Sequence, residues 1–199
     1  MDPRPLLVGS HPAADFLNTT VSTADGLVER LADGRALLDW LVAVGLLEAP
    51  AAAAARARWP AADLDRVAAE ARRLRERARR VLEDWRAGRA LRPGRLLPLN
   101  ALLERGSAHR ALALRGGRWT LVERARLDAP AQLLVPVAQA LAALLADEEP
   151  ERVRSCAGAG CTLWFVDRTR SGRRRFCSAE LCGNRARVAA YRQRHGRGG

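Results

Sequence analysis

The sequence has 199 residues, of which 48% are hydrophobic, and a formal net charge of +12 at neutral pH. This apolar content is enough for a buried core, which excludes a disordered tail, and the length suits one medium domain or two small ones. All 34 basic residues are arginines. Arginine without lysine is typical of a GC-rich genome, but also of a surface that binds phosphate or carboxylate, and composition alone does not separate the two.

The excess charge lies at the carboxyl end of the chain. Residues 151–199 contain 12 arginines and 3 acidic residues, a net charge of +9, whereas residues 1–150 have a net charge of +3. This asymmetry predicts an acidic partner for the last quarter of the chain, and nucleic acid is the commonest such partner.

No segment has the pattern of a membrane or export signal. Residues 1–12 lack a basic stretch followed by an apolar run, so we expect no signal peptide. The most apolar stretch, residues 133–146, has 14 residues, fewer than the roughly 20 that span a bilayer. We therefore expect a cytoplasmic protein with no membrane partner.

Helical spacing of apolar residues dominates the first ninety positions. We expect a short helix within residues 11–20, where Pro12 suits a first helical turn, and an amphipathic helix over residues 34–47. Residues 60–86 have the strongest helical period. This stripe predicts either a helix packed inside the chain's own bundle or a coiled-coil seam between two copies, and hence a homodimer. Its members are Leu64, Val67, Ala71, Leu74, Ala78, Val81 and Trp85.

The pattern changes after residue 95. Residues 96–103 predict a shorter helix, and the alternation of apolar and polar residues around Gly116-Gly117 predicts a β-hairpin. Residues 130–146 return to helix, and the acidic residues 147–149 before Pro150 indicate a domain boundary. The predicted domains are residues 1–149 and 150–199.

Several polar residues of the first domain have two possible interpretations, a ligand pocket or a structural role. His11, Asp15 and Asn18 fall at helical spacing, and Asn100 follows in a later helix. Such a cluster could line a pocket for a small-molecule effector. The alternative, helix capping and buried hydrogen bonds that fix the fold, is the commoner role of such residues.

All four cysteines lie in the last 44 residues, as Cys156-x4-Cys161-x15-Cys177-x4-Cys182. In an intracellular protein, two cysteine pairs at this spacing indicate metal ligation rather than disulfides, and zinc is the usual metal. Four sulfur ligands leave no open coordination position. The spacing therefore predicts one structural Zn²⁺ ion and no catalytic metal.

The residues around the cysteines suit a small zinc-binding fold. Gly158 and Gly160 allow a tight knuckle, residues 163–166 and 173–176 are expected to pair as a hairpin, and Ser178 can cap a helix that contains Cys182. Knuckle, hairpin and helix are the parts of a treble-clef-like finger. The whole chain is thus expected to be α+β and mainly α. We expect Arg175, Asn184 and Arg185 to brace the metal site from outside the ligand set.

Residues 174–185, with the sequence RRFCSAELCGNR, resemble the CGNR zinc-finger family, which is named after Cys182-Gly183-Asn184-Arg185. The resemblance covers about residues 150–195. Phe176 stands where tryptophan is usual, and Arg187 where lysine is common. Asp15–Thr19, Trp40–Leu47 and Leu99-Asn100 are similar to the ABATE-type domain that precedes this finger. The combination implies a bacterial-type, stress-induced regulator of transcription.

The finger's arginines are the candidate contacts to DNA. Leu181, Val188 and Tyr191 share one side of the last helix and are expected to face the finger core, which leaves arginines exposed. The same basic surface would also suit an acidic protein or RNA. No triad of catalytic residues has a recognisable spacing, so we do not expect an enzyme. The predicted nucleic-acid contacts are Arg168, Arg170, Arg173, Arg174, Arg187, Arg192 and Arg194.

Overall fold

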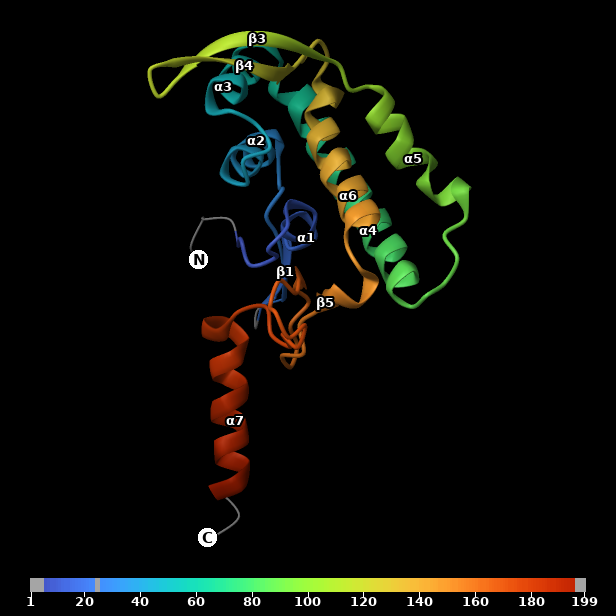
Figure 1. The fold of residues 1–199 in the computed structure, drawn as a ribbon, viewed down its shortest axis with the longest axis vertical. Coiled ribbons are helices and arrows are strands. Elements are labelled where there is room, and N and C mark those ends of the chain that lie inside the picture. The colour runs from blue at the N-terminus through green and yellow to red at the C-terminus, as the bar shows by residue number, and fades with distance from the viewer. Residues whose placement is uncertain (1–5, 24–25, 196–199) are drawn as a thin grey trace.

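The computed structural model describes residues 6–23 and 26–195. A layered helical body occupies one end, and a single helix projects from the other (Figure 1). The elements follow one another as α1 (Pro12–Leu17), β1 (Thr20–Thr23), β2 (Gly26–Glu29), α2 (Gly34–Ala43), α3 (Ala49–Arg58), α4 (Ala61–Arg86), α5 (Pro93–Glu104), β3 (Ala108–Arg115), β4 (Arg118–Ala125), η1 (Pro130–Leu134), α6 (Val135–Asp147), η2 (Pro150–Arg152), β5 (Val153–Ser155), β6 (Trp164–Val166), η3 (Ala179–Gly183) and α7 (Asn184–His195). This confirms the prediction of a mainly helical α+β fold.

Helix α4 is the long element against which the body is built. Its apolar stripe is buried except at the half-buried Trp85, and the helix packs against α2, η1 and α1, so the intrachain alternative is confirmed for this stripe. Helix α2 approaches α4 closely at Gly34, where an added Cβ would lie 2.3 Å from the Cβ of Leu64. Asp33 caps α2 by accepting a hydrogen bond from the Ala36 N–H, 2.7 Å away.

Helix α6 continues from η1, and together they form an 18-residue apolar run, Pro130–Asp147. By length and composition alone this run is able to cross a membrane, and it is longer than the stretch of 14 residues expected from the sequence. In the fold, however, α6 packs against α1 and α5, and η1 packs against α4. The run therefore serves as a core helix.

The described residues form three two-stranded antiparallel sheets. The predicted hairpin is confirmed as β3–β4, which pairs Ala108 with Ala125 and turns at Gly116 and Gly117. The β1–β2 hairpin was not predicted. Strand β6 pairs with β5 and not with residues 173–176, so the predicted pairing of the finger strands was wrong. The alanine-rich segment Ala49–Arg58 forms helix α3.

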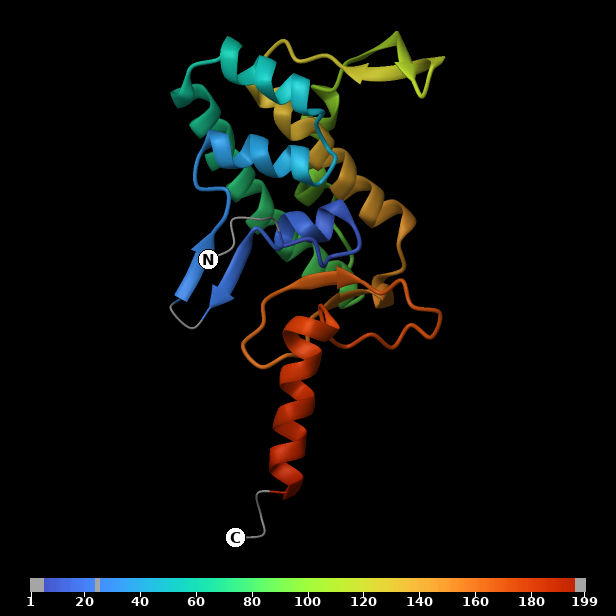
Figure 2. The ribbon, with the colours of Figure 1, turned by 90° about the vertical axis from the view of Figure 1, so that its left-hand side faces the viewer.

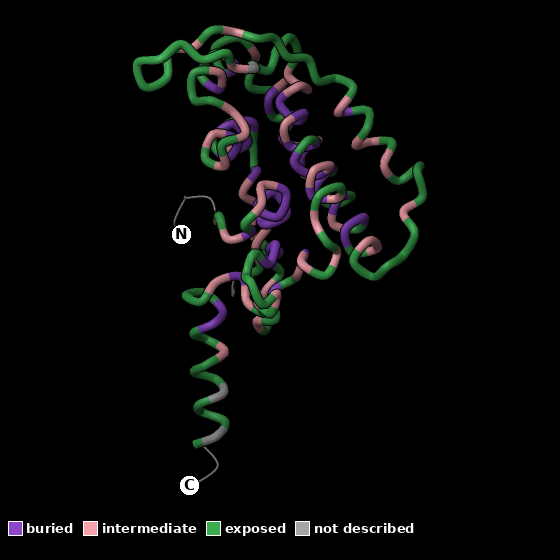
Figure 3. The backbone as a smooth tube through the Cα atoms, in the orientation of Figure 1, coloured by how far each residue is buried: buried purple, intermediate pink, exposed green. Residues whose placement is uncertain are grey.

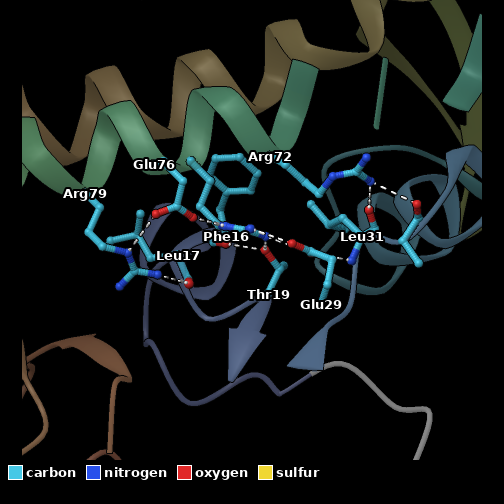
Figure 4. Close-up of polar contacts among 10 residues, drawn as sticks. Phe16, Leu17, Thr19, Glu29, Leu31, Arg72, Glu76 and Arg79 are labelled. Carbon is cyan, nitrogen blue, oxygen red and sulfur yellow. Dashed lines mark hydrogen bonds and ion pairs between the residues drawn. The ribbon is translucent and has the colours of Figure 1, made fainter. Parts of the chain in front are cut away.

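A buried arginine on α4 fixes the β1–β2 hairpin to the helical body (Figure 4). Arg75 is 3% exposed and binds both carboxylate oxygens of Glu29, at 2.8 and 2.6 Å, and the hydroxyl of Thr19 at 2.9 Å. Although burial opposes ionisation, the Arg75 guanidinium holds the pKa of Glu29 below its usual value. On either side, Arg72 donates to the carbonyls of Leu31 and Ala32, and Arg79 to that of Leu17.

The hydrophobic core does not divide at the predicted domain boundary. Val153, Trp164 and Val166 belong to the same buried cluster as residues of α1, α4 and α6. Figure 3 shows buried positions both along the helical body and at the base from which α7 projects. The Arg86 guanidinium, at the end of α4, lies 5.0 Å from the centroid of the Trp164 ring. The β5–β6 hairpin is thus packed on the helical body rather than tethered to it.

Helix α7 leaves the rest of the molecule (Figure 2). Leu181, Val188 and Tyr191 are 40%, 50% and 58% exposed. The prediction that they face the finger core was wrong, because three buried cysteines, Leu163 and Phe165 already fill the small core beneath η3 and the helix continues beyond it.

Candidate metal centre and basic finger

Four elements bring the cysteines together. Cys156 follows β5, Cys161 precedes β6, Cys177 follows the loop after β6, and Cys182 lies in η3. Their four sulfur atoms all lie within 4.8 Å of one another. A tetrahedral zinc site with Zn–S bonds of about 2.3 Å separates its sulfurs by about 3.8 Å, so the cluster fits such an ion after small contractions.

The backbone around the first cysteine pair is shaped for convergent sulfurs. Gly160 has a φ of +69°, a conformation that glycine adopts without strain. A Cβ on Gly158 would lie 2.9 Å from the sulfur of Cys182, so a larger residue there would push the two halves of the site apart. The sulfur of Cys156 accepts hydrogen bonds from the N–H groups of Cys177 at 3.2 Å and Gly158 at 3.4 Å. Such donors suit a thiolate.

The cysteine thiols differ in how readily they ionise, because their surroundings shift their pKa values in different directions. Burial raises the pKa of Cys161 to about 11 and that of Cys177 further still. For Cys156 burial acts in the same direction, but the two N–H donors outweigh it and lower the pKa. A cation that binds all four sulfurs must therefore displace protons, which is the usual behaviour of structural zinc sites.

Of the three residues expected to brace the site, only Arg185 contacts a sulfur in the described structure. It donates from Nη2 to the Cys182 sulfur at 3.0 Å and from Nε to the Leu181 carbonyl at 2.8 Å. The bond to Cys182 raises the pKa of Arg185. Asn184 is exposed and accepts from Arg187, while the Arg175 guanidinium lies 5.7 Å from the ring centroid of Phe176.

Two predicted nucleic-acid contacts have other partners. Arg168 forms an ion pair with Glu148 at the end of the helical body. Arg174 donates to the Val8 carbonyl and the Ser10 hydroxyl, both at 2.9 Å, and lies 4.2 Å from the Phe165 ring centroid. Both residues join the finger to the body, and the Arg168 side chain is still 54% exposed, so a contact of either residue with nucleic acid stays a prediction. Their partners are 20 and more than 160 residues away in the sequence, beyond the reach of local pattern.

The other predicted contacts stay open to solvent. Arg170, Arg173, Arg187 and Arg192 are exposed, and the side chain of Arg194 lies outside the part that the structure describes. Two clefts flank the base of α7 and share Arg175 and Phe176 as a common wall. Arg174, Ser178 and Arg187 also line one of them, and Gly158, Arg185 and Gln193 the other.

Three of the four residues of the predicted effector pocket have structural partners. The ring of His11 caps α1 by accepting from the Ala13 N–H, at 3.1 Å, and burial lowers its pKa. Asp15 accepts from the Gly9 N–H at 2.7 Å. Asn18 makes two hydrogen bonds to the backbone of Trp164, at 2.8 and 2.9 Å. Asn100 is exposed on α5, beyond α4 and α6 as seen from α1 (Figure 1).

One residue that shapes the finger was missed. Asp167 is fully buried and accepts hydrogen bonds from Thr169 N–H and Oγ1, at 2.9 and 2.6 Å, and from the Arg174 N–H at 2.7 Å. It folds the loop that follows β6, which is why residues 173–176 do not return as a strand. An aspartate two residues before a threonine is an Asx-turn signal that could have identified this role.

Comparisons with known proteins agree with this architecture. The model of the ABATE family, described as "putative stress-induced transcription regulator", matches residues 10–148, and the model of the CGNR zinc finger matches residues 152–195. A comparison with curated proteins finds no match. The two family matches confirm the resemblance that the sequence motifs indicated.

Proposed function

Because this chain belongs to the ABATE family and ends in a CGNR zinc finger, we propose that it regulates transcription by binding duplex DNA with that finger. The observation that carries the proposal is the position of α7. This helix projects from the body (Figure 2), its described arginines Arg185, Arg187 and Arg192 are exposed, and Arg185 contacts the Cys182 sulfur.

In this proposal Cys156, Cys161, Cys177 and Cys182 hold one Zn²⁺ ion. Four thiolates satisfy its tetrahedral preference, so the ion supplies rigidity and no open coordination position. Four thiolates and one divalent cation carry a net charge of −2, which the Arg185 guanidinium partly offsets from 3.0 Å. The ion then fixes where α7 begins relative to the body.

The dimensions and charge of α7 suit a nucleic acid. A helix with its side chains is about 10–12 Å across, and the major groove of B-DNA is about 12 Å wide. Twelve residues form a helix of only marginal stability on their own, so a partner that contacts α7 also stabilises it. Arg187 and Arg192 on α7, with Arg170, Arg173 and Arg175 near its base, are the proposed contacts to phosphate.

The helical body is proposed to act as the regulatory part of a cytoplasmic protein, through an effector or through dimerisation. Asn18 and Arg174 join it to the finger by hydrogen bonds. A change of packing around α1 would therefore move the finger. The experiments below on DNA binding do not depend on which of these two forms of regulation applies.

The decisive experiment measures the affinity of the zinc-loaded full chain for labelled duplex DNA by fluorescence anisotropy across a salt series. Five phosphate contacts predict that log K falls against log [salt] with a slope of about −4.5. Arg187→Ala and Arg192→Ala should each reduce the slope by about 1. Arg35→Ala on α2, whose side chain is also exposed, is the matched control and should leave the slope unchanged.

Two results would contradict the proposal. One is the absence of duplex binding at low salt by protein that contains zinc. The other is tighter binding to single-stranded RNA or to an acidic protein, together with an affinity for duplex DNA that Arg187→Ala and Arg192→Ala leave unchanged.

A further inference from the structure

The β3–β4 hairpin exposes an apolar face at the end of the molecule opposite α7 (Figures 1 and 2). Its register places Leu112 opposite Leu121 and Leu114 opposite Trp119, and these four side chains share one face because alternate residues of a strand point the same way. They are 67%, 57%, 61% and 71% exposed, respectively.

The other face of the hairpin is turned toward the body. Ala111, Ala113 and Val122 alternate with the exposed residues and are half-buried. Arg115, on that same face, forms an ion pair of 3.3 Å with Glu48 at the start of α3. This ion pair links that face of the hairpin to α3, and the apolar face remains without a partner among the described residues.

An isolated two-stranded hairpin is marginally stable in water, and it gains stability when an apolar face is covered. Three leucines and one tryptophan at these exposures present roughly 350 Å² of apolar surface, within the range of patches on monomers that often serve a function. The surface is flat and has two cross-strand apolar pairs at its centre. It suits another sheet better than it suits a small ligand, which binds in concave sites.

We propose that the partner is the hairpin of a second copy of this chain, packed face to face across a two-fold axis. Two copies would cover roughly 700 Å² of apolar surface, and with their polar rims would approach the roughly 1,000 Å² that a specific interface needs. The same patch serves both subunits, as two-fold symmetry requires. An interface of this size forms a concentration-dependent dimer. The inference does not rest on the proposed function, and it replaces the α4 seam as the route to a homodimer.

Sedimentation velocity of the zinc-loaded full chain over a concentration series tests the proposal. The wild-type chain should change from monomer to dimer as concentration rises. Leu121→Glu places a carboxylate in the interface and should raise the dissociation constant at least about tenfold. Thr120→Glu, its neighbour on the opposite face, is the matched control and should leave that constant within about twofold. Equal melting temperatures would show that both variants fold.

Hydrogen exchange provides a second test that needs no substitution. Amides of residues 108–125 should exchange more slowly above the dimerisation concentration than below it, while those of α7 should not respond. Three results would overturn the proposal: a wild-type chain that stays monomeric well above micromolar concentration, a dimer that Leu121→Glu leaves intact, or hairpin exchange that is independent of concentration.

Discussion

At the scale of single residues, a few buried polar side chains join segments that are far apart in the sequence. Asn18 satisfies both the N–H and the carbonyl of Trp164, a residue of the finger, from the end of α1. Asp15, one helical turn earlier, holds the Gly9 N–H. Gly9 in turn accepts from the Val166 N–H at 2.8 Å. Residues 8–10 thus lie between the body and the finger.

Asn18→Ala should lower the free energy of unfolding by about 2–4 kcal/mol, because it leaves two buried backbone groups without partners. Denaturant unfolding monitored by circular dichroism measures this loss. Asn100→Ala, at an exposed position on α5, is the control and should change stability by less than about 0.5 kcal/mol. Equal stabilities of the two variants would contradict the structural role of Asn18.

Asp15 should make stability depend on pH. Burial raises the pKa of Asp15 to about 6, well above the usual value for an aspartate, although the N–H groups of Gly9 and Val8 and the charge of Arg174 act in the opposite direction. The folded state therefore holds the proton of Asp15 more tightly than the unfolded state. The free energy of unfolding falls as pH rises from the usual pKa of an aspartate to about 6.

Between pH 5 and pH 7 the wild-type chain should lose about 1 kcal/mol relative to Asp15→Asn, which keeps an oxygen acceptor but does not ionise. Urea unfolding of both zinc-loaded proteins at the two pH values measures the difference. A constant difference between them would show that Asp15 ionises normally.

Local chemistry predicted some residue roles but not others. The cysteine cluster was predictable, because its spacing along the chain is itself the signal. The roles of Arg168 and Arg174 were not, since a basic side chain does not reveal a distant acceptor such as the Val8 carbonyl. Arg185 was predictable because it lies three residues, or about one helical turn, after the ligand Cys182.

At the scale of elements, α4 organises the body through both of its sides. Its apolar stripe packs into the core, while Arg72, Arg75 and Arg79 hold the segment from Leu17 to Ala32 (Figure 4). A regular period of three and four made α4 predictable to within a residue at either end. The β1–β2 hairpin was missed because its four-residue strands have little alternation and depend on Arg75 and Glu29 for their position.

Arg75→Ala should lower the free energy of unfolding by about 3 kcal/mol, since it leaves the Glu29 carboxylate half-buried without its cation. Arg77→Ala is the matched control two residues away on the exposed side of α4, where the described residues provide no ion-pair partner, and should cost less than about 0.5 kcal/mol. Chemical denaturation measures the free energy of unfolding of both variants. A larger loss for Arg75→Ala shows that its contacts matter, whereas equal losses would indicate only the removal of one positive charge.

At the scale of the whole molecule, the metal site and the helical body share a core. Trp164 and Val166 lie between two of the cysteines in sequence and pack on α1 in space. The predicted boundary between two domains came from the acidic residues 147–149 before Pro150, and acidic residues report a break in the chain at the surface. They do not report which apolar residues of the finger are buried against the body.

Removal of zinc by a strong chelator should therefore destabilise more than the finger. We expect a lower melting temperature of the helical signal, by several degrees, and full recovery when zinc is restored. Magnesium should not restore it, because four sulfurs do not suit that ion. A helical body with the same melting temperature with and without zinc would contradict the shared core.

The fold of the finger and the position of α7 depend most on the ion that the four sulfurs are proposed to hold. X-ray absorption at the zinc edge, on full-length protein whose metal content has been determined, tests this directly. The result we predict is one zinc per chain with four sulfur neighbours at about 2.3 Å and no nitrogen or oxygen ligand. A metal-free folded protein, or a zinc ion with an oxygen or nitrogen in its first shell, would contradict it.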